Sequence, residues 1–370
     1  VQTCALPIFM EKDIRNLRRA LDILKASKTE KDYINSMKKI LFRADAKPSI
    51  GIGDLMSLIH LSKYFEKDGW KTYFMIKGYQ PALDLVAKYG ISDFETINVD
   101  ATIADEVVEI NKVCSNFDID VIFFEISERY LSEYTGLIVK PLKVAATIND
   151  KLLDDIALIL DWDPKAKALF GDSVYPYAKK LLGMEFVILP YQFLYDDRIY
   201  KREYRKIPSK VLVAMGGADE YDFTSKVVSV LLDMKDEIEL RVVVGSGYTN
   251  MKHLQSILEN TDLKYEILHN VADMLESYLW CDVGIGAGGL TCSELVATKT
   301  PSVVLATYEH QIQRCLAFEE KGLISYLGYR VFDADRLKSL VKNPVLPADA
   351  FAFKTDAIVD ALNDLLKEKR

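Results

Sequence analysis

From residue 38 onward the chain repeats one pattern: a short apolar run, a polar or glycine-bearing turn, and a stretch with apolar residues three and four positions apart. Short apolar runs bounded by turn residues are typical of buried strands, and the longer spacing is typical of amphipathic helices. Strands that alternate with helices predict α/β domains with parallel, doubly wound sheets. The predicted strands lie in KKILFRAD, KTYFMIK, DVIFFEIS, PLKVAATIND, DIALILDWD and FVILPYQF, and then in KVLVAMGGAD, ELRVVVGSGYTN, KYEILHN, WCDVGIGAGG and TPSVVLA.

The pattern is interrupted by one charged segment, YDDRIYKREYRKIPSK. Such a composition is expected of an interdomain connection, and 370 residues exceed what one hydrophobic core usually supports. We therefore expect two Rossmann-like domains, residues 38–205 and residues 206–370, the second ending in a helix.

The start of the chain stands apart from this pattern. Residues 1–8 (VQTCALPI) lack a methionine and resemble a translated sequencing adapter, so we exclude them from fold reasoning. Residues 9–37 predict an amphipathic helix and a polar linker. This helix resembles the closing segment of sugar-nucleotide cytidylyltransferases, which suggests a fused or adjacent domain of that kind. A plain leading helix, or upstream sequence before a start at Met37, is the alternative interpretation.

Composition excludes several function classes. The formal charge is −8, from 47 basic and 55 acidic residues, and no Lys/Arg-rich run predicts a nucleic-acid surface. No apolar stretch reaches the roughly 18–20 residues that a membrane span needs, and no secretory leader is present, so we expect a cytoplasmic protein. The five cysteines show no zinc-ligand spacing, so no metal site is predicted.

Glycines in the second half follow predicted strands and precede predicted helices. Ligands of parallel sheets bind beyond the carboxyl ends of the strands, and glycine lets backbone amides approach a phosphate closely. One such glycine alone is more often a simple turn, but three loops together predict a cradle for a pyrophosphate. The glycines are Gly216 and Gly217, Gly245 and Gly247, and Gly288 and Gly289.

Polar residues next to these loops are candidate ligand contacts. Thr291 and Glu294 follow the last glycines, and we expect Glu294 on the first turn of a helix, where its carboxylate could accept both hydroxyls of a ribose. A helix N-terminal Glu stabilised by the helix dipole is the alternative. His310 and Gln311 lie in the next loop, where either could bind a sugar or a phosphate or simply be solvated.

Several motifs together indicate a family. They are Arg43-Ala44-Asp45 leading to Ile50-Gly51-Ile52-Gly53, then LGMEFVILPYQF, VLVAMGGAD, VVGSG and GAGGLTCSELVATKTPSVVLATYEHQ. With these motifs the chain from Lys38 to about Gly328 resembles the UDP-2,4-diacetamido-2,4,6-trideoxy-β-L-altropyranose hydrolases of pseudaminic acid (nonulosonate) synthesis. Those enzymes are similar to the UDP-N-acetylglucosamine transferase of peptidoglycan synthesis.

The resemblance implies a GT-B fold, two Rossmann-like domains whose parallel sheets face across a cleft. It implies that the first domain handles the sugar or acceptor and the second holds UDP, without a cofactor or a metal. The nucleotide contacts that the resemblance implies are Gly216, Gly217, Gly288, Gly289, Thr291 and Glu294, and the glycine cradle adds Gly245 and Gly247. The substrate contacts that we expect are Arg43, Asp45, Gly51, Gly53, His310 and Gln311.

The first domain departs from the family at its catalytic motif. The family sequence Gly-x-Gly-His-x-x-Arg reads Gly51-Ile52-Gly53-Asp54-Leu55-Met56-Ser57 here, without the histidine and the arginine. Asp54 could activate water as carboxylates of inverting hydrolases do, although a helix N-terminus would weaken it as a base, or it could be a helix N-cap. A second departure is FFEIS (Phe123–Ser127), where relatives commonly carry an Asp and a Tyr.

Three hypotheses follow from these residues. The first is a UDP-sugar hydrolase that releases UDP by attack at the anomeric carbon. The second is a glycosyltransferase of the same architecture that uses an acceptor other than water. The third is a module that binds a nucleotide sugar without catalysis.

Overall fold

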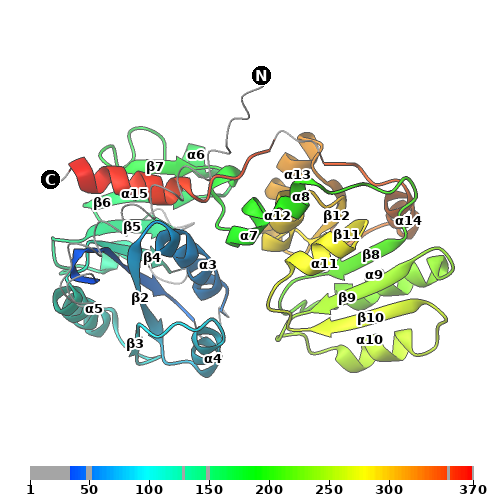
Figure 1. The fold of residues 1–370 in the computed structure, drawn as a ribbon, viewed down its shortest axis with the longest axis horizontal. Helices are drawn as coiled ribbons and strands as arrows, with labels where there is room; N and C mark the ends of the chain where they lie inside the picture. Colours follow the sequence, from blue (N-terminus) through cyan, green and yellow to red (C-terminus); the bar gives the residue numbers. More distant parts are fainter. Residues whose placement is uncertain (1–33, 47–51, 127–129, 147–150, 348–350, 369–370) are drawn as a thin grey trace, which may run out of the picture. The chain divides into compact units, whose positions relative to one another are not determined.

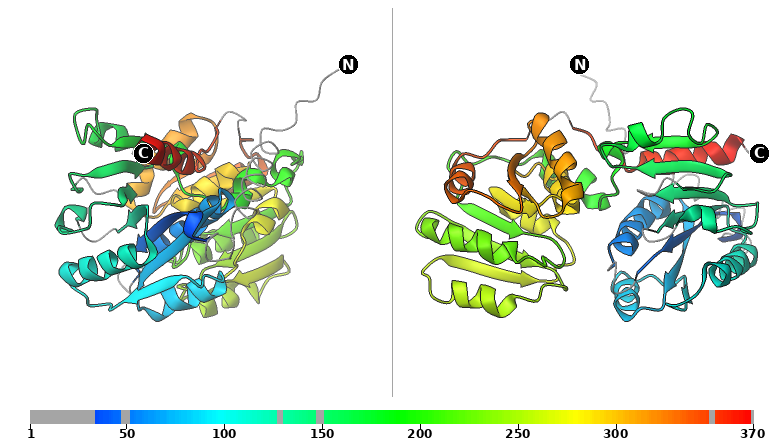
Figure 2. Two further views of the ribbon diagram at one scale, coloured as in Figure 1. Left: turned by 60° about the vertical axis from the view of Figure 1, so that its left-hand side comes forward. Right: turned by 180° about the vertical axis from the view of Figure 1, so that it is seen from behind.

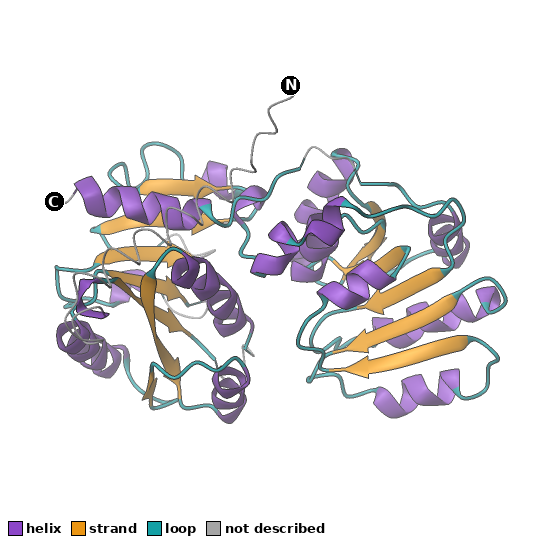
Figure 3. Ribbon diagram, in the orientation of Figure 1, coloured by secondary structure: helices purple, strands orange, loops and turns teal. Residues whose placement is uncertain are grey.

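The computed structural model describes residues 34–46, 52–126, 130–146, 151–347 and 351–368, and the predictions for residues 1–33 and for Gly51 lie outside them. The chain forms two compact units (Figure 1). The N-terminal unit comprises Val1–Ile188 and Lys354–Arg370, and the C-terminal unit comprises Leu189–Phe353. Each unit contains one parallel sheet with helices against it (Figure 3), as the alternating pattern predicts.

The sheet of the N-terminal unit has the strand order β3-β2-β1-β4-β5-β6-β7. Chain direction across the sheet reverses between β1 and β4, because β2 and β3 lie on one side of β1 and the later strands on the other. This is the topological switch point, where α/β proteins bind ligands. The strands are β1 (Lys38–Ala44), β2 (Trp70–Lys77), β3 (Phe94–Ile97), β4 (Val121–Glu125), β5 (Leu142–Ala146), β6 (Ile156–Asp161) and β7 (Lys179–Leu182).

The two faces of this sheet carry different helices. Leu41, Ile122 and Phe124 pack in the core with α5 (Ile103–Phe117). Phe42 lies on the other face, against Phe65 of α3 (Gly53–Lys67). Because side chains alternate along a strand, the face of every residue in β1 and β4 follows from these contacts. This part of the chain also contains α4 (Gln80–Lys88) and α6 (Ala166–Leu169).

The sheet of the C-terminal unit has the order β10-β9-β8-β11-β12-β13, with its switch point between β8 and β11. Its strands are β8 (Lys210–Ala214), β9 (Glu239–Val244), β10 (Lys264–His269), β11 (Val283–Ala287), β12 (Ser302–Ala306) and β13 (Ser325–Tyr329). Its helices are α7 (Tyr191–Tyr195), α8 (Asp197–Tyr200), α9 (Phe223–Leu231), α10 (Met251–Leu258), α11 (Leu275–Trp280), α12 (Leu290–Ala297), α13 (Ile312–Glu320) and α14 (Ala334–Lys342).

Strand β8 lies between two apolar cores. Val211 and Val213 pack with residues of α9 and α10, whereas Leu212 and Ala214 pack with residues of α11 and α12. A strand buried on both faces reads as a continuous apolar run, which is the pattern of KVLVA. Packing on both faces of the sheet therefore supports the loops that follow β8 and β11.

One predicted strand is wrong. FVILPYQF forms no strand: Val187, Ile188 and Leu189 are buried outside regular structure, and the chain then enters α7. Pro190 has no backbone N–H to donate to a sheet, so this apolar run cannot continue as an inner strand. The sheets instead gain the short strands β3, β7 and β13, whose sequences do not stand out as apolar runs.

The unit boundaries also differ from the predicted division at residue 205. Residues 189–205 belong to the C-terminal unit, because Phe193 and Ile199 enter its core and the Arg202 guanidinium donates to the Tyr278 carbonyl oxygen. Residues 354–370 belong to the N-terminal unit, not to the C-terminal domain in which we expected the last helix.

That last helix is α15 (Ala357–Glu368), drawn in red in Figures 1 and 2. It buries one apolar face on the N-terminal unit. The Thr355 hydroxyl donates to the Val187 carbonyl oxygen at 2.8 Å, and the Asn363 amide donates to the Asp68 carboxylate at 2.8 Å. These contacts fix the end of the chain to the first sheet. The buried side chains of the helix are Ile358, Val359, Ala361 and Leu362.

Candidate functional site

The loops after β8 and β9 are packed backbone to backbone. The Gly247 N–H donates to the Gly217 carbonyl oxygen at 3.1 Å. A Cβ added at Gly245 would lie 2.3 Å from that same oxygen, so only glycine fits there. A Cβ added at Gly217 would meet no atom within 4 Å, and Gly217 is exposed. The two loops are thus packed tightly together, and the backbone at Gly217 is exposed.

The loop after β11 leads directly into α12. Strands β8 and β11 are parallel neighbours, with Ala214 opposite Gly286, so the loops that follow them leave the same edge of the sheet. A Cβ added at Gly288 would lie 2.6 Å from the Cys315 Sγ, and Gly289 immediately precedes the first residue of α12. The close packing holds the N-terminus of α12 at this edge, and the first amides of a helix favour an anion there.

Glu294 lies further along α12 than we expected. The helix begins at Leu290, so Glu294 is past the first turn. The buried Tyr278 hydroxyl of α11 donates to Glu294 Oε2 at 2.5 Å. Desolvation by the surrounding protein raises the pKa of Glu294, and the Tyr278 hydrogen bond opposes that rise. Tyr278 therefore fixes one carboxylate oxygen and sets the orientation of the other.

The loop after β12 is held by Gln311 and extends to His310. Gln311 is buried, and its Oε1 accepts hydrogen bonds from the Thr307 N–H at 2.9 Å and the Tyr308 N–H at 3.3 Å. A Cβ added at Gly289 would lie 3.4 Å from Gln311 Nε2, so the amide side of Gln311 faces the start of α12. His310 is exposed, and its ring stacks on Tyr308 with 5.8 Å between centroids.

Arg43 and Asp45 lie in a buried ion network on the α5 face of the first sheet. The Arg43 guanidinium donates to Asp45 Oδ1 at 2.7 Å and to Glu106 Oε2 at 2.7 Å, and Arg43 and Glu106 are 0% exposed. The Lys77 ammonium and the Tyr134 hydroxyl also donate to Glu106. These charges pair with one another inside the domain, which favours a structural role for Arg43, although its Nε has no hydrogen-bond partner among the described residues.

Asp54 lies at the beginning of α3, on the opposite face of the same sheet. The helix begins at Gly53 with Ile52 as its N-cap, so Asp54 is not the N-cap residue. Glu125, at the end of β4, is buried, and its Oε2 has no hydrogen-bond partner in the part of the chain that the structure describes. Burial, followed by the charge of Asp54, raises the pKa of Glu125 well above its ordinary value. The two carboxyl groups therefore influence each other.

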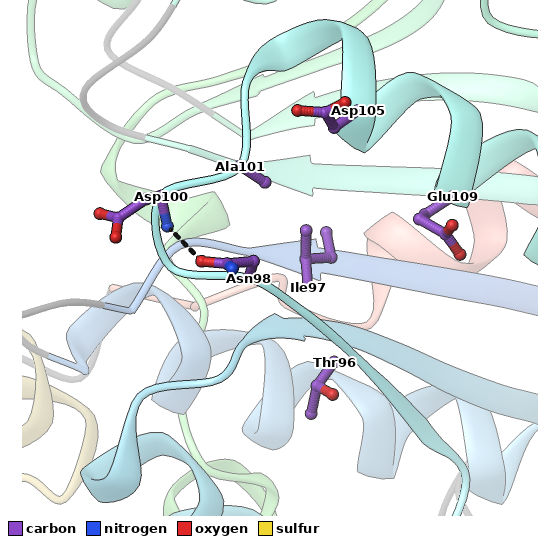
Figure 4. Close-up of a pocket in the computed structure, with 7 residues that line it drawn as sticks. All are labelled: Thr96, Ile97, Asn98, Asp100, Ala101, Asp105 and Glu109. Atoms are coloured by element: carbon purple, nitrogen blue, oxygen red, sulfur yellow. Dashed lines mark hydrogen bonds between the residues drawn. The ribbon is translucent and has the colours of Figure 1, made fainter.

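A separate pocket lies at the end of β3 and the start of α5 (Figure 4). The Asp100 N–H donates to Asn98 Oδ1 at 2.9 Å, and Asp105 caps α5 with Thr102. Its carboxylates repel an anion, so this pocket is unsuited to a diphosphate. The lining residues are Thr96, Ile97, Asn98, Asp100, Ala101, Asp105 and Glu109.

Comparisons with known proteins find similarity to one family domain and to several solved structures. Residues 211–368 match the glycosyltransferase family 28 C-terminal domain. MurG of Acinetobacter baumannii superposes with a TM-score of 0.60 at 13% identity, covering 88% of this chain and 99% of that one. The fold is GT-B. The matched segment of this GT-B chain contains every glycine loop described above, together with Thr291, Glu294, His310 and Gln311.

Two curated relatives match parts of the GT-B chain. An uncharacterised protein of Methanocaldococcus jannaschii is 23% identical over 242 residues, 65% of this chain and 43% of the relative. The UDP-N-acetylglucosamine–N-acetylmuramyl-(pentapeptide) pyrophosphoryl-undecaprenol N-acetylglucosamine transferase of Photorhabdus laumondii is 28% identical over 166 residues, 42% of this chain and 46% of the relative. The chain thus spans less than half the length of the curated relatives it matches.

The described residues also bear on two other types of site. No helix there is long and apolar enough to cross a membrane. No group of three or more His, Cys, Asp or Glu residues there is arranged to hold a metal ion.

Sequence reasoning missed Glu125 and Tyr278 in the GT-B chain. Glu125 closes the apolar strand of FFEIS, and only its acidic type within a buried run could have marked it. Tyr278 lies on α11, and no local motif connects it to Glu294. The neighbours of both residues can be recognised only in the folded structure.

Proposed function

We propose that the chain binds a UDP-linked amino sugar and cleaves the bond between the anomeric carbon and UDP. The observation that carries this proposal is an arrangement in the C-terminal unit: the exposed backbone at Gly217 and the start of α12 follow neighbouring parallel strands, and Tyr278 orients Glu294 of α12. They lie in the segment that matches the glycosyltransferase family 28 C-terminal domain.

Each feature suits a different part of a nucleoside diphosphate. Backbone N–H groups at the start of α12 and around Gly217 suit the diphosphate, whose charge they can stabilise without a metal. A carboxylate oxygen of Glu294 suits the ribose hydroxyls, because it accepts hydrogen bonds and the other oxygen is held by Tyr278. In the reaction, the attacking hydroxyl oxygen bonds to the anomeric carbon and gives up its proton. The bond from that carbon to UDP breaks, and UDP leaves with the electron pair.

We favour water as the attacking group, which makes the protein a UDP-sugar hydrolase of nonulosonate synthesis. This rests on the motif order from Arg43 to Gln311 that resembles the pseudaminic acid hydrolases. Asp54, at the start of α3 in the N-terminal unit, is the base that we assign to the attacking hydroxyl.

Glycosyl transfer to another acceptor is the second candidate. It is favoured by the match to a glycosyltransferase family domain and by the absence, in the sequence, of the hydrolase histidine and arginine at Asp54 and Ser57. In that case the altered residues of the first domain recognise an acceptor.

Calorimetry and product analysis test the proposal in two steps. We expect UDP to bind to the intact protein and UMP, which lacks the second phosphate, to bind more weakly. Mass spectrometry should then detect UDP and a free sugar from one member of a panel of UDP-amino-sugars. UDP release only when an acceptor is added selects transfer, and tight UDP binding without turnover on any substrate selects the non-catalytic hypothesis. No binding of UDP would refute the proposal.

A further inference from the structure

Glu125 lies where α/β sheets bind ligands. It is the last residue of β4, next to β1 across the switch point, and it pairs in register with Ala44. Phe123, two residues earlier, packs against Phe42 on the α3 face of the sheet. Because alternate residues of a strand share a face, the Glu125 side chain also lies on the α3 face. Arg43, Asp45 and Glu106 lie on the opposite face, so their ion network does not neutralise it.

Among the described residues, few groups near Glu125 can form a hydrogen bond or an ion pair with its side chain. Ala44 of β1, which pairs in register with Glu125, carries no charge. In the part of the chain that the structure describes, the charged group that acts on Glu125 is Asp54 of α3, and both groups are acidic. Glu125 is 8% exposed, and its Oε2 has no hydrogen-bond partner within the described ranges. A buried polar atom without a partner is costly, and a bound ligand is one way in which proteins satisfy it.

We propose that the carboxyl group of Glu125 binds an oxygen atom of the sugar part of the substrate, next to Asp54. This inference rests on the proposed function and adds to it the residue that recognises the sugar. A hydroxyl or acetamido oxygen of an amino sugar accepts a hydrogen bond, which is the contact that a neutral carboxyl group can offer.

The division of charge between the two acids supports this assignment. Burial and the nearby Asp54 both raise the pKa of Glu125, which favours its neutral, protonated form. The start of α3 favours the negative charge on Asp54. Glu125 is then a hydrogen-bond donor to the sugar while Asp54 stays available as a base, as neutral carboxylic acids are used in other enzyme sites.

Three variants separate sugar binding from a structural role. Glu125→Gln keeps the shape and an N–H donor, Glu125→Met keeps the volume without a donor, and Glu95→Gln is a control on exposed β3. The affinities of UDP and of UDP-N-acetylglucosamine and UDP-N-acetylgalactosamine are measured by calorimetry on the full chain. We expect Glu125→Met to lose about tenfold in affinity for the UDP-sugar that binds tighter than UDP, with UDP itself unchanged. Glu125→Gln should stay within about threefold of the wild type.

The pH dependence adds a readout that packing alone would not move. As the pH rises and Glu125 loses its proton, the wild type should lose its preference for the UDP-sugar over UDP, whereas Glu125→Gln should keep it. Equal UDP-sugar affinity in the wild type, Glu125→Gln and Glu125→Met overturns the assignment of Glu125. So does the finding that no UDP-sugar binds tighter than UDP. Either result leaves UDP binding intact. Failure of UDP itself to bind the wild type overturns the proposed function instead, so the two failures are distinguishable.

Discussion

At the scale of single residues, two carboxylates show how partners set the direction of a pKa shift. Burial raises the pKa of both Glu294 and Glu106, but Glu294 has one hydrogen bond from Tyr278 to oppose the rise. Glu106 faces the Arg43 charge and hydrogen bonds from Lys77, Arg43 and Tyr134, which together bring its pKa down to about 2. Glu294 is thus suited to a ligand, and Glu106 to holding the fold.

Replacing Glu294 with Gln should weaken UDP binding. The substitution exchanges a charged acceptor for a neutral amide and disturbs the Tyr278 contact, so we expect a loss of about tenfold in affinity. Calorimetry with UDP measures it. Glu276→Gln is the matched control, because Glu276 lies exposed on α11 and pairs with Arg198. Equal UDP affinity in Glu294→Gln and the wild type would contradict the ribose assignment.

Replacing Glu106 with Gln should destabilise the N-terminal unit. It leaves the buried Arg43 charge with one carboxylate fewer, a change that typically costs about 3–5 kcal/mol. The folded-state pKa is lowered from 4.5 to about 2, so the contribution of Glu106 is present above pH 4.5 and is lost as the pH falls toward 2.

Urea unfolding of the wild type and of Glu106→Gln at several pH values measures both effects. The stability difference should be full at neutral pH and shrink on acidification below pH 4.5. Glu109→Gln, one turn along the exposed side of α5, should change stability by less than about 0.5 kcal/mol. A difference that stays constant with pH would show that the ionised carboxylate is not the cause.

The sequence indicates residue types at these positions but not their environments. Arg43 and Asp45 precede a glycine-bearing loop, a pattern that favours ligand contact, yet the side chains lie in an ion network whose other members are far along the chain, at Lys77, Glu106 and Tyr134. Long-range partners of this kind leave no local pattern. Glu125 was missed for the same reason, because the environment of its side chain depends on how α3 packs over β4.

At the scale of elements, Gly217 and Gly245 lie in adjoining loops but should respond differently to alanine. A methyl group at Gly217 meets no protein atom within 4 Å, so Gly217→Ala should fold like the wild type while its methyl group obstructs a bound diphosphate. A methyl group at Gly245 would overlap the Gly217 carbonyl, so Gly245→Ala should lower the melting temperature as well.

Thermal unfolding and UDP calorimetry on both variants distinguish the two effects. We expect Gly217→Ala to lose at least about tenfold in UDP affinity at an unchanged melting temperature. Gly171→Ala is the control, since its methyl group also meets nothing within 4 Å but lies in the other unit, outside the residues assigned to the site. Unchanged UDP affinity in Gly217→Ala would remove this loop from the diphosphate site.

The repeating apolar runs predicted most of the strands because an inner parallel strand is buried on both faces. The run VLVA became β8, and SVVLA became β12. FVILPYQF failed because burial alone does not distinguish a strand from a buried connection, and Pro190 is the local clue against a strand. The exposed strand β10 was also predicted, at KYEILHN.

At the scale of the whole molecule, α15 should contribute to the stability of the N-terminal unit, to which it adds the last helix. Leu362 is fully buried, and Leu362→Ala should cost about 2–5 kcal/mol. The effect should appear in the unfolding of the N-terminal unit and leave UDP affinity unchanged under native conditions.

Denaturant unfolding with limited proteolysis, which reports the first sites of cleavage, tests this assignment. Glu368→Ala, at the exposed end of α15, is the control and should be neutral within about 0.5 kcal/mol. Early cleavage within residues 189–353 of Leu362→Ala would indicate that the helix instead supports the C-terminal unit.

The boundary of the units was the part of the architecture that the sequence predicted least well. An amphipathic helix shows that one of its faces is buried, but not which core receives it, so α15 was assigned to the sheet nearest in sequence. The charged segment near residue 205 was predicted to be the connection, yet it belongs to the C-terminal unit, where the Arg202 guanidinium donates to the carbonyl oxygens of Tyr278 and Cys281. The crossover lies earlier, at Ile188 and Leu189, within buried apolar residues.

Because α15 belongs to the N-terminal unit, the ribosome synthesises the whole C-terminal unit before the N-terminal unit has its last helix. A ribosome releases all of residues 189–353 before it releases α15, so the C-terminal unit can finish folding while the N-terminal sheet still lacks its last helix. The nascent N-terminal unit therefore exposes the apolar surface that Ile358, Val359 and Leu362 later cover. That surface stays exposed to water until α15 has been synthesised and has docked.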